Sequence, residues 1–248
     1  MPFPRASTVL FLVFFLLVPC RHAVALSISV QPIQVCNNGN CADPSRQLFV
    51  AETQQIWSQA GIGVDFLPWN TFDAVNNPYY DLDVNSEFLS LILQPAHGQN
   101  VSSLVIDMWF VNSLDNNPNA FGVSILDYGY VAISDSVFDW NGGLGRIDTI
   151  AHELGHTLNL DHYSGPNIGV NLMASGGARF VPNTINNIYP NGLDYDQLTP
   201  AQIALAQQSR YVTDSTVPEP TTLLLFGSGV GMVAFWRKRL RGAAAKLT

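Results

Sequence analysis

The order of apolar and polar positions between residues 26 and 213 predicts a domain that mixes strands with helices. Residues 103–111 (SLVIDMWFV) are an apolar run of strand length, and residues 63–69 (GVDFLPW) alternate as a half-buried strand does. Residues 86–93 (SEFLSLIL) have helical spacing and stop before Pro95. Together with an extended start at residues 27–35, this pattern predicts the first half of an α/β domain.

Two further helices are predicted from their end signals. Asp43 and Pro44 have the residue types of a helix cap and a first helical position, and the apolar residues that follow recur at helical spacing as far as Gly61. Near the other end of the domain, Thr199 and Pro200 repeat the same cap signal ahead of a segment with good helix composition. We therefore expect helices after residue 43 and after residue 199.

The second half of the pattern contains the most amphipathic helix. Residues 120–136 predict one or two strands with a bend near Gly129, and the turn WNGGLG follows at residues 140–145. From Arg146 to Leu158 the apolar residues form one stripe, which predicts a helix packed on a sheet. The fold expected is α/β (α+β), with a twisted mixed sheet, this central helix and a C-terminal helix. The members of the stripe are Ile147, Ile150, Leu154 and Leu158.

Residues 1–25 have the pattern of a signal peptide. They carry Arg5, then an apolar run from Val9 to Val18, and end in Ala23, Val24 and Ala25, small residues that suit a signal peptidase. The alternatives are a buried core helix or a membrane anchor, but the run is too short to span a bilayer. We expect the mature chain to begin near Leu26 and the protein to be exported.

Residues 214–248 combine a linker with a second apolar segment. Pro218, Glu219 and Pro220 precede an apolar run over residues 221–236, and a basic cluster follows it. As a helix the run would rise about 24 Å, against a hydrocarbon core of about 30 Å, so it spans a bilayer only with thinning or snorkelling. The basic tail would stay on the cytoplasmic side. The cluster consists of Arg237, Lys238, Arg239 and Arg241.

This arrangement resembles the PEP-CTERM sorting signal of Gram-negative bacteria. The resemblance implies that a membrane enzyme of the exosortase type processes the protein. It also implies inner-membrane anchoring before processing and a final place at the cell surface or in the extracellular matrix. An ordinary C-terminal anchor would share the topology, and with either reading the domain lies outside the cytoplasm.

Charge and cysteine content narrow the partners of the domain. The full chain has a net charge of −8, and residues 26–216 contain no Lys and only four Arg. Such an acidic surface repels nucleic acid, so we expect no nucleic-acid partner. Cys36 and Cys41 are the cysteines of the mature chain, and in an oxidising compartment we expect them to form a local disulfide. The alternative is a thiol that caps a metal in a latent precursor.

Three of the five histidines in the chain fall within residues 151–162 (AHELGHTLNLDH). His152 and His156 are four residues apart, so both imidazoles lie on one helix face and can reach the same ion. Glu153 points about 100° away from His152 and can approach a metal-bound water without being a ligand. His162 lies beyond that face, so the chain must turn after Leu158. Asn159 tolerates the left-handed conformation such a turn needs.

These residues resemble the metzincin zinc-peptidase motif HExxHxxGxxH, with Asn159 at the Gly position. Metzincins also have a methionine turn below the zinc, and Met173 in NLMASG lies a suitable distance downstream. Some members carry a Tyr two residues after that Met, where this chain has Ser175. The resemblance is loose over the rest of the domain, and its diagnostic part is the stretch from His152 to Met173.

The resemblance implies a metzincin-like zincin domain over residues 26–213 and a mechanism for it. His152, His156 and His162 would bind one zinc and leave a position open for water, as catalytic zinc sites do. Glu153 would act as general base, so the expected function is a secreted zinc metalloendopeptidase that hydrolyses proteins or peptides. The metzincin substrate binds along an edge strand, for which residues 120–134 are the candidate.

Two alternatives to that function stay open at the level of sequence. One is a surface or biofilm-matrix protein that keeps the zincin fold as a binding or structural module without catalysis. The other is zinc-dependent hydrolysis of a different amide or ester bond. Glu153 favours catalysis, because a structural metal site has no use for a carboxylate there. Calcium binding by paired acidic residues is a further candidate, set against ordinary solvated loops. The pairs are Asp81 with Asp83, and Asp194 with Asp196.

Overall fold

The structure is a computed structural model that describes residues 24–43, 45–94, 96–117 and 119–216. Within them, Ala25–Asp214 form one compact unit. None of the helices in the described ranges has the length and apolar character of a membrane span. The predicted signal peptide, Pro44, the sorting residues Pro218, Glu219 and Pro220, and the predicted C-terminal membrane helix lie outside the described residues, apart from the last two positions of the signal peptide.

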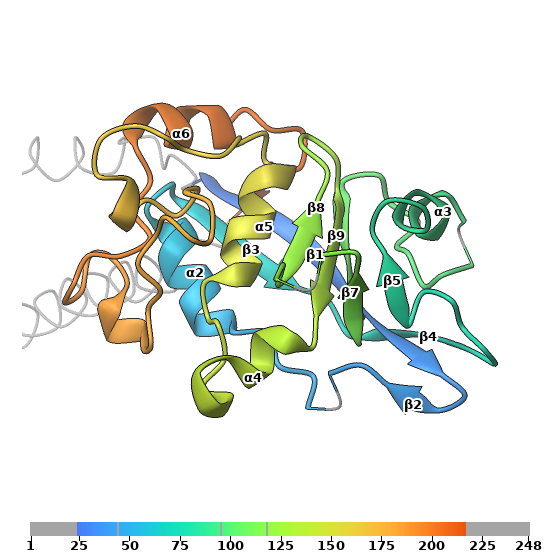
Figure 1. The fold of residues 1–248 in the computed structure, drawn as a ribbon. Coiled ribbons are helices and arrows are strands. Elements are labelled where there is room, and N and C mark those ends of the chain that lie inside the picture. The colour runs from blue at the N-terminus through green and yellow to red at the C-terminus, as the bar shows by residue number, and fades with distance from the viewer. Residues whose placement is uncertain (1–23, 44, 95, 118, 217–248) are drawn as a thin grey trace, which may run out of the picture. The chain divides into compact units, whose positions relative to one another are not determined.

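The centre of the fold is a mixed sheet built around one long strand (Figure 1). Strand β1 (Val24–Asn37) pairs in parallel with β3 (Ile62–Phe66), β4 (Asn70–Ala74) and β6 (Val105–Val111). Strand β9 (Tyr130–Ser134) continues the sheet in parallel, and β8 (Gly122–Ser124) closes its edge antiparallel to β9. The strand order β10-β1-β6-β9-β8 includes β10 (Thr213–Thr216). The predicted α/β class with a mixed sheet is therefore confirmed.

The sheet separates two hydrophobic cores. Alternate residues of β6 enter opposite cores: Met108 and Phe110 pack on one face, Trp109 and Val111 on the other, and all four are fully buried. Because both faces are covered, β6 is a continuous apolar run instead of an alternating one. This burial explains why residues 103–111 stood out in the sequence as a strong strand.

Two helices cover the face on which Met108 lies. Helix α2 (Val50–Ser58) contributes Ile56 and Trp57 to this core, and α5 (Thr149–Thr157) contributes the buried stripe that its sequence predicted. Helix α5 contacts β8, β9 and α2. The helix that carries two of the histidines is thus held between the edge of the sheet and a second helix.

The other face of the sheet is covered by shorter elements. Helix α3 (Phe88–Leu93) packs its buried residues against Trp109 and Val111. Strands β5 (Asp81–Asp83) and β7 (Ser113–Asp115) form a separate parallel pair. Both lie on the same side of Figure 1 as α3.

The remaining elements lie in the second half of the chain, apart from the short strand β2 near the start. They are α4 (Ser136–Gly143), η1 (Ile168–Val170), η2 (Ile185–Asn187), α6 (Pro200–Ala206) and β2 (Asn40–Cys41). In α6 the predicted cap is present, because Thr199 Oγ1 accepts a hydrogen bond from the Gln202 amide at 3.2 Å. The predicted turn at residues 140–145 coincides with non-helical backbone at the end of α4.

The predicted helix start at Asp43 and Pro44 was wrong. Helix α2 begins only at Val50, and Asp43 is a buried loop residue with a φ of +39°. Its amide donates to Asp135 Oδ1 at 2.6 Å, and its carbonyl accepts from Gln34 Nε2 at 2.9 Å. Arg46 and Phe49 have φ values of +53° and +45°, so the backbone between Asp43 and Val50 is not helical.

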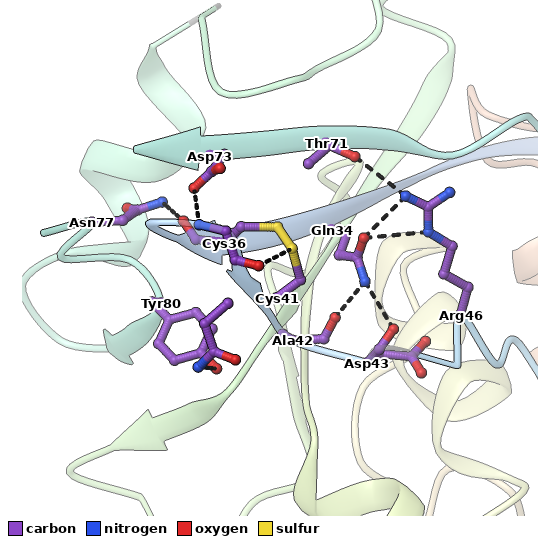
Figure 2. The surroundings of a disulfide bond; sticks show 12 residues. Gln34, Cys36, Cys41, Ala42, Asp43, Arg46, Thr71, Asp73, Asn77 and Tyr80 are labelled. Carbon is purple, nitrogen blue, oxygen red and sulfur yellow. Dashed lines mark hydrogen bonds between the residues drawn. A yellow bond between two sulfur atoms is a disulfide. The ribbon is translucent and has the colours of Figure 1, made fainter. Parts of the chain in front are cut away.

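Figure 2 shows how this loop is tied to the β1–β2 hairpin. A disulfide joins Cys36 and Cys41, which face each other across the two strands, so neither sulfur is available as a metal ligand. Arg46 donates from Nε and Nη2 to Gln34 Oε1 at 3.2 and 3.1 Å, and Gln34 in turn holds the carbonyl of Ala42. The hairpin and loop form a rigid corner at one end of β1.

The two-sided burial of β6 can be tested by truncation. We expect Met108→Ala to lower the free energy of unfolding of the full chain by about 2–5 kcal/mol, because it leaves a cavity in a closed core. Leu93→Ala is the control, since Leu93 is 69% exposed and its loss should cost under about 0.5 kcal/mol. Chemical denaturation measures both values, and equal losses would contradict a core on this face of the sheet.

Candidate metal centre

The first two histidines are placed by the regular geometry of α5. His152 and His156 stand one turn apart on the helix, with their ring centroids 4.8 Å apart. The buried stripe on the opposite face packs against the sheet and prevents the helix from rotating. Both imidazoles are therefore held on the side of α5 that faces away from the core of the sheet.

The third histidine is brought back by a turn at Asn159. This residue has a φ of +68°, the left-handed conformation expected from the sequence, and the Leu160 amide donates to the carbonyl of Gly155 at 2.9 Å. The chain reverses there, and the ring centroid of His162 comes to 4.8 Å from that of His156 and 5.5 Å from that of His152. The turn therefore does what the spacing of the histidines requires.

The three histidines form a set of ligands that converge on one point. One nitrogen of each lies within 4.8 Å of the others, and within the described ranges this is the group of His, Cys, Asp and Glu side chains that could share an ion. Nitrogen ligands at about 2.0–2.1 Å from zinc in a tetrahedral arrangement fit such a group after a small contraction. Three imidazoles leave one tetrahedral position for water or substrate.

Backbone carbonyls contact Nδ1 of the first two histidines. Nδ1 of His152 lies 2.7 Å from the Leu172 carbonyl, and Nδ1 of His156 lies 2.7 Å from the Leu160 carbonyl. A carbonyl only accepts, so Nδ1 of His156 carries the hydrogen and its Nε2 has a free lone pair for a metal. Nδ1 of His152 also lies against Arg179 Nη1, which only donates, so the carbonyl alone does not set the tautomer of His152. Burial lowers the pKa of both side chains, that of His152 well below its usual value, which keeps them neutral as ligation requires.

Glu153 is buried beside the histidines and is held by the edge strand. Its Oε2 accepts a hydrogen bond from Ser124 Oγ at 2.6 Å, and its exposed fraction is 6%. Burial raises the pKa of Glu153, while the bond from Ser124 opposes that rise. Gly122 makes the contact possible, because a Cβ there would lie 2.7 Å from Glu153 Cγ. Ser124 and Gly122 could not be found from the motif alone.

Met173 lies directly beneath α5. It is fully buried, and a Cβ on Gly155 would overlap its sulfur, so the glycine in the helix is needed for this contact. The amide of Tyr163 donates to the Met173 carbonyl at 2.8 Å, which ties the segment after His162 to the segment around Met173. Met173, the residue predicted for a methionine turn, thus packs against the glycine that stands between His152 and His156 in α5.

A buried cluster of charged side chains, which the sequence did not predict, packs against His152 and the Leu172 carbonyl. Asp148 is fully buried and lies 2.8 Å from Arg179 Nε and 3.4 Å from Arg146 Nε. Arg179 Nη1 donates to the Leu172 carbonyl at 2.7 Å and lies against Nδ1 of His152. The same carbonyl therefore serves both a histidine ligand and the ion cluster. Two of the four Arg residues of the domain belong to this cluster. The scarcity of Arg in the domain is the one feature of the sequence that could have drawn attention to them.

A pocket of about 230 Å³ opens beside the histidines. Its walls come from the start of α5, from the segment leading into β8 and from the loop after Met173, and they include His152, Glu153 and His162. A larger hollow of about 720 Å³ lies elsewhere, around Asp107 and Tyr211, and none of the three histidines lines it. We place the chemistry in the smaller pocket, because only there do the metal-ligand set and a carboxylate meet.

The acidic residues considered for calcium binding differ in their surroundings. Asp81 Oδ1 accepts from Asn112 Nδ2 at 2.6 Å and from Ser113 Oγ at 2.7 Å. Backbone and side-chain hydrogen bonds lower the pKa of Asp83, whereas burial and the nearby Asp148 raise that of Asp196. Asp194 is a loop residue with a φ of +56°. Calcium binding stays a prediction for these residues.

Residues 216–239 match a protein-family description, the PEP-CTERM protein-sorting motif. The chain carries a PEP-CTERM sorting motif. The match covers the tail alone, and Pro218, Glu219 and Pro220 lie inside it. No curated protein sequence matches the chain.

Solved structures with similar folds include several peptidases. Mature mirolysin from Tannerella forsythia, in complex with a cleaved peptide, has a TM-score of 0.49 at 12% identity, over 75% of this chain and 94% of that one. Archaemetzincin from Methanopyrus kandleri has a TM-score of 0.44 at 14% identity, over 78% and 98% of the two chains. A chaperone–substrate complex has a TM-score of 0.46 at 11% identity, and there the match covers 75% of this chain and 34% of the other.

The contact between Gly155 and Met173 is open to a direct test. We expect Gly155→Ala to lower the free energy of unfolding by about 1–3 kcal/mol, because the new methyl group must displace the sulfur in a packed core. Gly177→Ala is the matched control, since a Cβ there meets nothing within 4 Å. Chemical denaturation of the full chain gives both values. If the two variants were equally stable, the close packing of Met173 under α5 would be wrong.

The larger hollow leads to a prediction about pH. Burial raises the pKa of Asp107 to about 7, although the Asn100 amide donates to it at 2.8 Å. The folded state therefore holds a proton that the unfolded state releases near pH 4, so stability falls as pH rises from about 4 through 7. Asp107→Asn should remove part of that decline. Denaturation curves at several pH values measure it, and an identical decline in the variant would contradict the raised pKa.

Proposed function

We propose that the protein is an exported zinc-dependent endopeptidase, with one zinc held by His152, His156 and His162. The observation that carries the proposal is the convergence of three imidazoles beside a buried carboxylate that is not one of them. A purely structural zinc site is closed by four protein ligands and needs no such carboxylate. The resemblance of these residues to the metzincin motif supports the same reading.

Glu153 is the residue to which we assign the proton transfers. A zinc ion at the three histidines would supply Lewis acidity toward the peptide carbonyl. Glu153 takes the proton of the attacking water and passes it to the departing amine, a role for which a raised pKa suits a carboxylate. Its bond from Ser124 leaves Oε1 free of any hydrogen bond in the described ranges and fixes the direction of the carboxylate.

The edge strand β8 offers a place for the substrate backbone. It pairs with β9 on one side and is the last strand in the order of the sheet, so its other edge can add a peptide in extended form. Ser124 and Gly122 in this strand touch Glu153, which brings a peptide bound along β8 next to the proposed base. This is the edge that the sequence indicated within residues 120–134.

The sorting motif supports the proposed location. We assign residues 1–25 to a signal peptide, 26–213 to the catalytic domain and 214–248 to the linker and sorting segment. A PEP-CTERM motif points to an exosortase-type enzyme as a partner and to export from a Gram-negative bacterium, with membrane anchoring through the C-terminal segment before processing. The final place would be the cell surface or the extracellular matrix.

The test compares the full chain with its Glu153→Gln variant. We expect both to bind about one zinc, and the variant to cut casein at least about a hundredfold more slowly, the usual size of a general-base contribution. A chelator should abolish cleavage by the parent protein. Glu52→Gln on α2 is the control and should cut normally. Metal analysis and a gel-based cleavage assay supply the data.

The alternatives give different results in the same experiment. If both forms bind zinc and neither cuts protein, the non-catalytic binding module becomes the better description. If neither binds zinc, the metal centre itself is wrong. Cleavage of a small ester or a non-peptide amide without any cleavage of protein would point to the third reading, a different zinc hydrolase.

A further inference from the structure

The pocket beside the histidines has a cationic wall that the proposed reaction does not use. Arg146 and Arg179 both line it, together with His152 and Glu153. They are 5% and 8% exposed, so their guanidinium groups are largely removed from bulk water. The remaining two Arg residues of residues 26–216, Arg46 and Arg210, are not among the lining residues. An otherwise acidic domain thus places half of its Arg residues at one pocket.

Arg146 is fixed in place but not saturated with hydrogen bonds. Its guanidinium carbon lies 5.3 Å from the ring centroid of Phe121 and 5.7 Å from that of Trp140, so two aromatic faces hold it. Its Nε approaches Asp148, and its Nη2 donates to the Gly176 carbonyl at 3.4 Å. Its Nη1 has no hydrogen-bond partner in the part of the chain that the structure describes.

Arg179 is held more tightly and still has a free donor group. Its Nε pairs with Asp148, and its Nη1 donates to the carbonyls of Leu172 and Ala174 at 2.7 and 3.3 Å. Its Nη2 has no hydrogen-bond partner among the described residues. Thr149 Oγ1, on the pocket wall and 3% exposed as a residue, is also without a partner there. Thr149 Oγ1 is itself buried, so the unused polar groups of the wall are the two guanidinium nitrogens, Arg146 Nη1 and Arg179 Nη2.

Glu153 is the one carboxylate among the residues that line the pocket, and its Oε2 accepts a hydrogen bond from Ser124 Oγ. Asp148 and Asp196 are absent from its lining, and Asp148 already bridges the two guanidinium groups. Asp196 is buried with both oxygens free of hydrogen bonds among the described residues, and burial raises its pKa well above the usual value. The two guanidinium groups therefore share the wall with Glu153 alone among the carboxylates, and the substitution Glu153→Gln removes that one negative charge.

We propose that this pocket binds a carboxylate of the substrate, so that the enzyme prefers an acidic residue next to the bond it cuts. The proposal rests on the proposed peptidase function, which supplies the bond that is cut. The pocket adjoins the histidine cluster, so a residue held in it would lie next to that bond. Guanidinium groups bind carboxylates through paired, charge-assisted hydrogen bonds, and a buried pocket strengthens those bonds.

The carboxylate could come from an Asp or Glu side chain or from the C-terminus of a peptide. Both sources have the same chemistry, and the experiment separates them by its choice of peptides. The probe is a set of random nonapeptides with blocked ends and either Glu or Gln at the central position. A second set has Gln at the centre and a free C-terminal carboxylate.

Binding is measured on the immobilised, zinc-loaded full chain that carries Glu153→Gln, so that peptides are retained without being cut. Mass spectrometry of the retained peptides gives the ratio of Glu to Gln. We expect about tenfold enrichment of Glu, in line with a charge-assisted pair. Enrichment of the free C-terminus alone would also support the carboxylate pocket, with the terminus as its ligand. Equal retention of all sets would overturn the proposal.

Two test variants and one control on the same background test the residues. Ser175→Asp puts a negative charge on an exposed lining residue and should abolish the enrichment, while Ser175→Asn should preserve it. Arg146→Gln should reduce it at least about fivefold, with zinc content as the check on folding. Enrichment that survives both Ser175→Asp and Arg146→Gln would overturn the assignment.

The outcome is independent of catalysis. If the parent protein cuts nothing but the Glu153→Gln form retains Glu peptides, the peptidase function fails and the carboxylate pocket stands. If the parent cuts protein but retention shows no preference for a carboxylate, the function stands and the pocket assignment fails. Mapping the cleaved bonds of casein then shows whether acidic residues are enriched beside them.

Discussion

A short helix cannot place three histidines around one ion, and that constraint shapes the second half of this protein. His152 and His156 share a face of α5, but the helix axis carries any later residue away from it. The chain must therefore reverse within a few residues, and Asn159 makes the reversal in the left-handed conformation. The reversal sets the direction of the chain, and the segments that follow, including the one at Met173, pack against the helix as a result.

The same turn determines which backbone groups become available to the site. After Asn159 the carbonyl of Leu160 reaches Nδ1 of His156, and farther along the carbonyl of Leu172 reaches Nδ1 of His152. The chain that returns beneath the helix thus contacts both histidine rings. The orientation of the ligands is a property of the loop as much as of the helix, so loop packing and metal chemistry are linked by physical contact.

The sequence was a good guide where the chemistry depends on local geometry. Helical spacing placed His152 and His156, and the tolerance of Asn for positive φ located the turn at Asn159. It was a poor guide where the partner is distant in the chain. Asp43 bonds to Gln34 and Asp135 and starts no helix, and Arg179 reaches Asp148 across 31 positions in a way that no spacing rule describes. Packing decides such contacts.

The Leu172 carbonyl has a consequence for how the loop between the third histidine and the methionine is ordered. This one oxygen contacts a ligand histidine and accepts from Arg179, whose other end is neutralised by Asp148. A metal ion bound at the proposed site would therefore also act on the loop and on the charges behind it. Part of the free energy of metal binding would then be free energy of loop ordering, so metal occupancy and proteolytic resistance of this loop would rise and fall together.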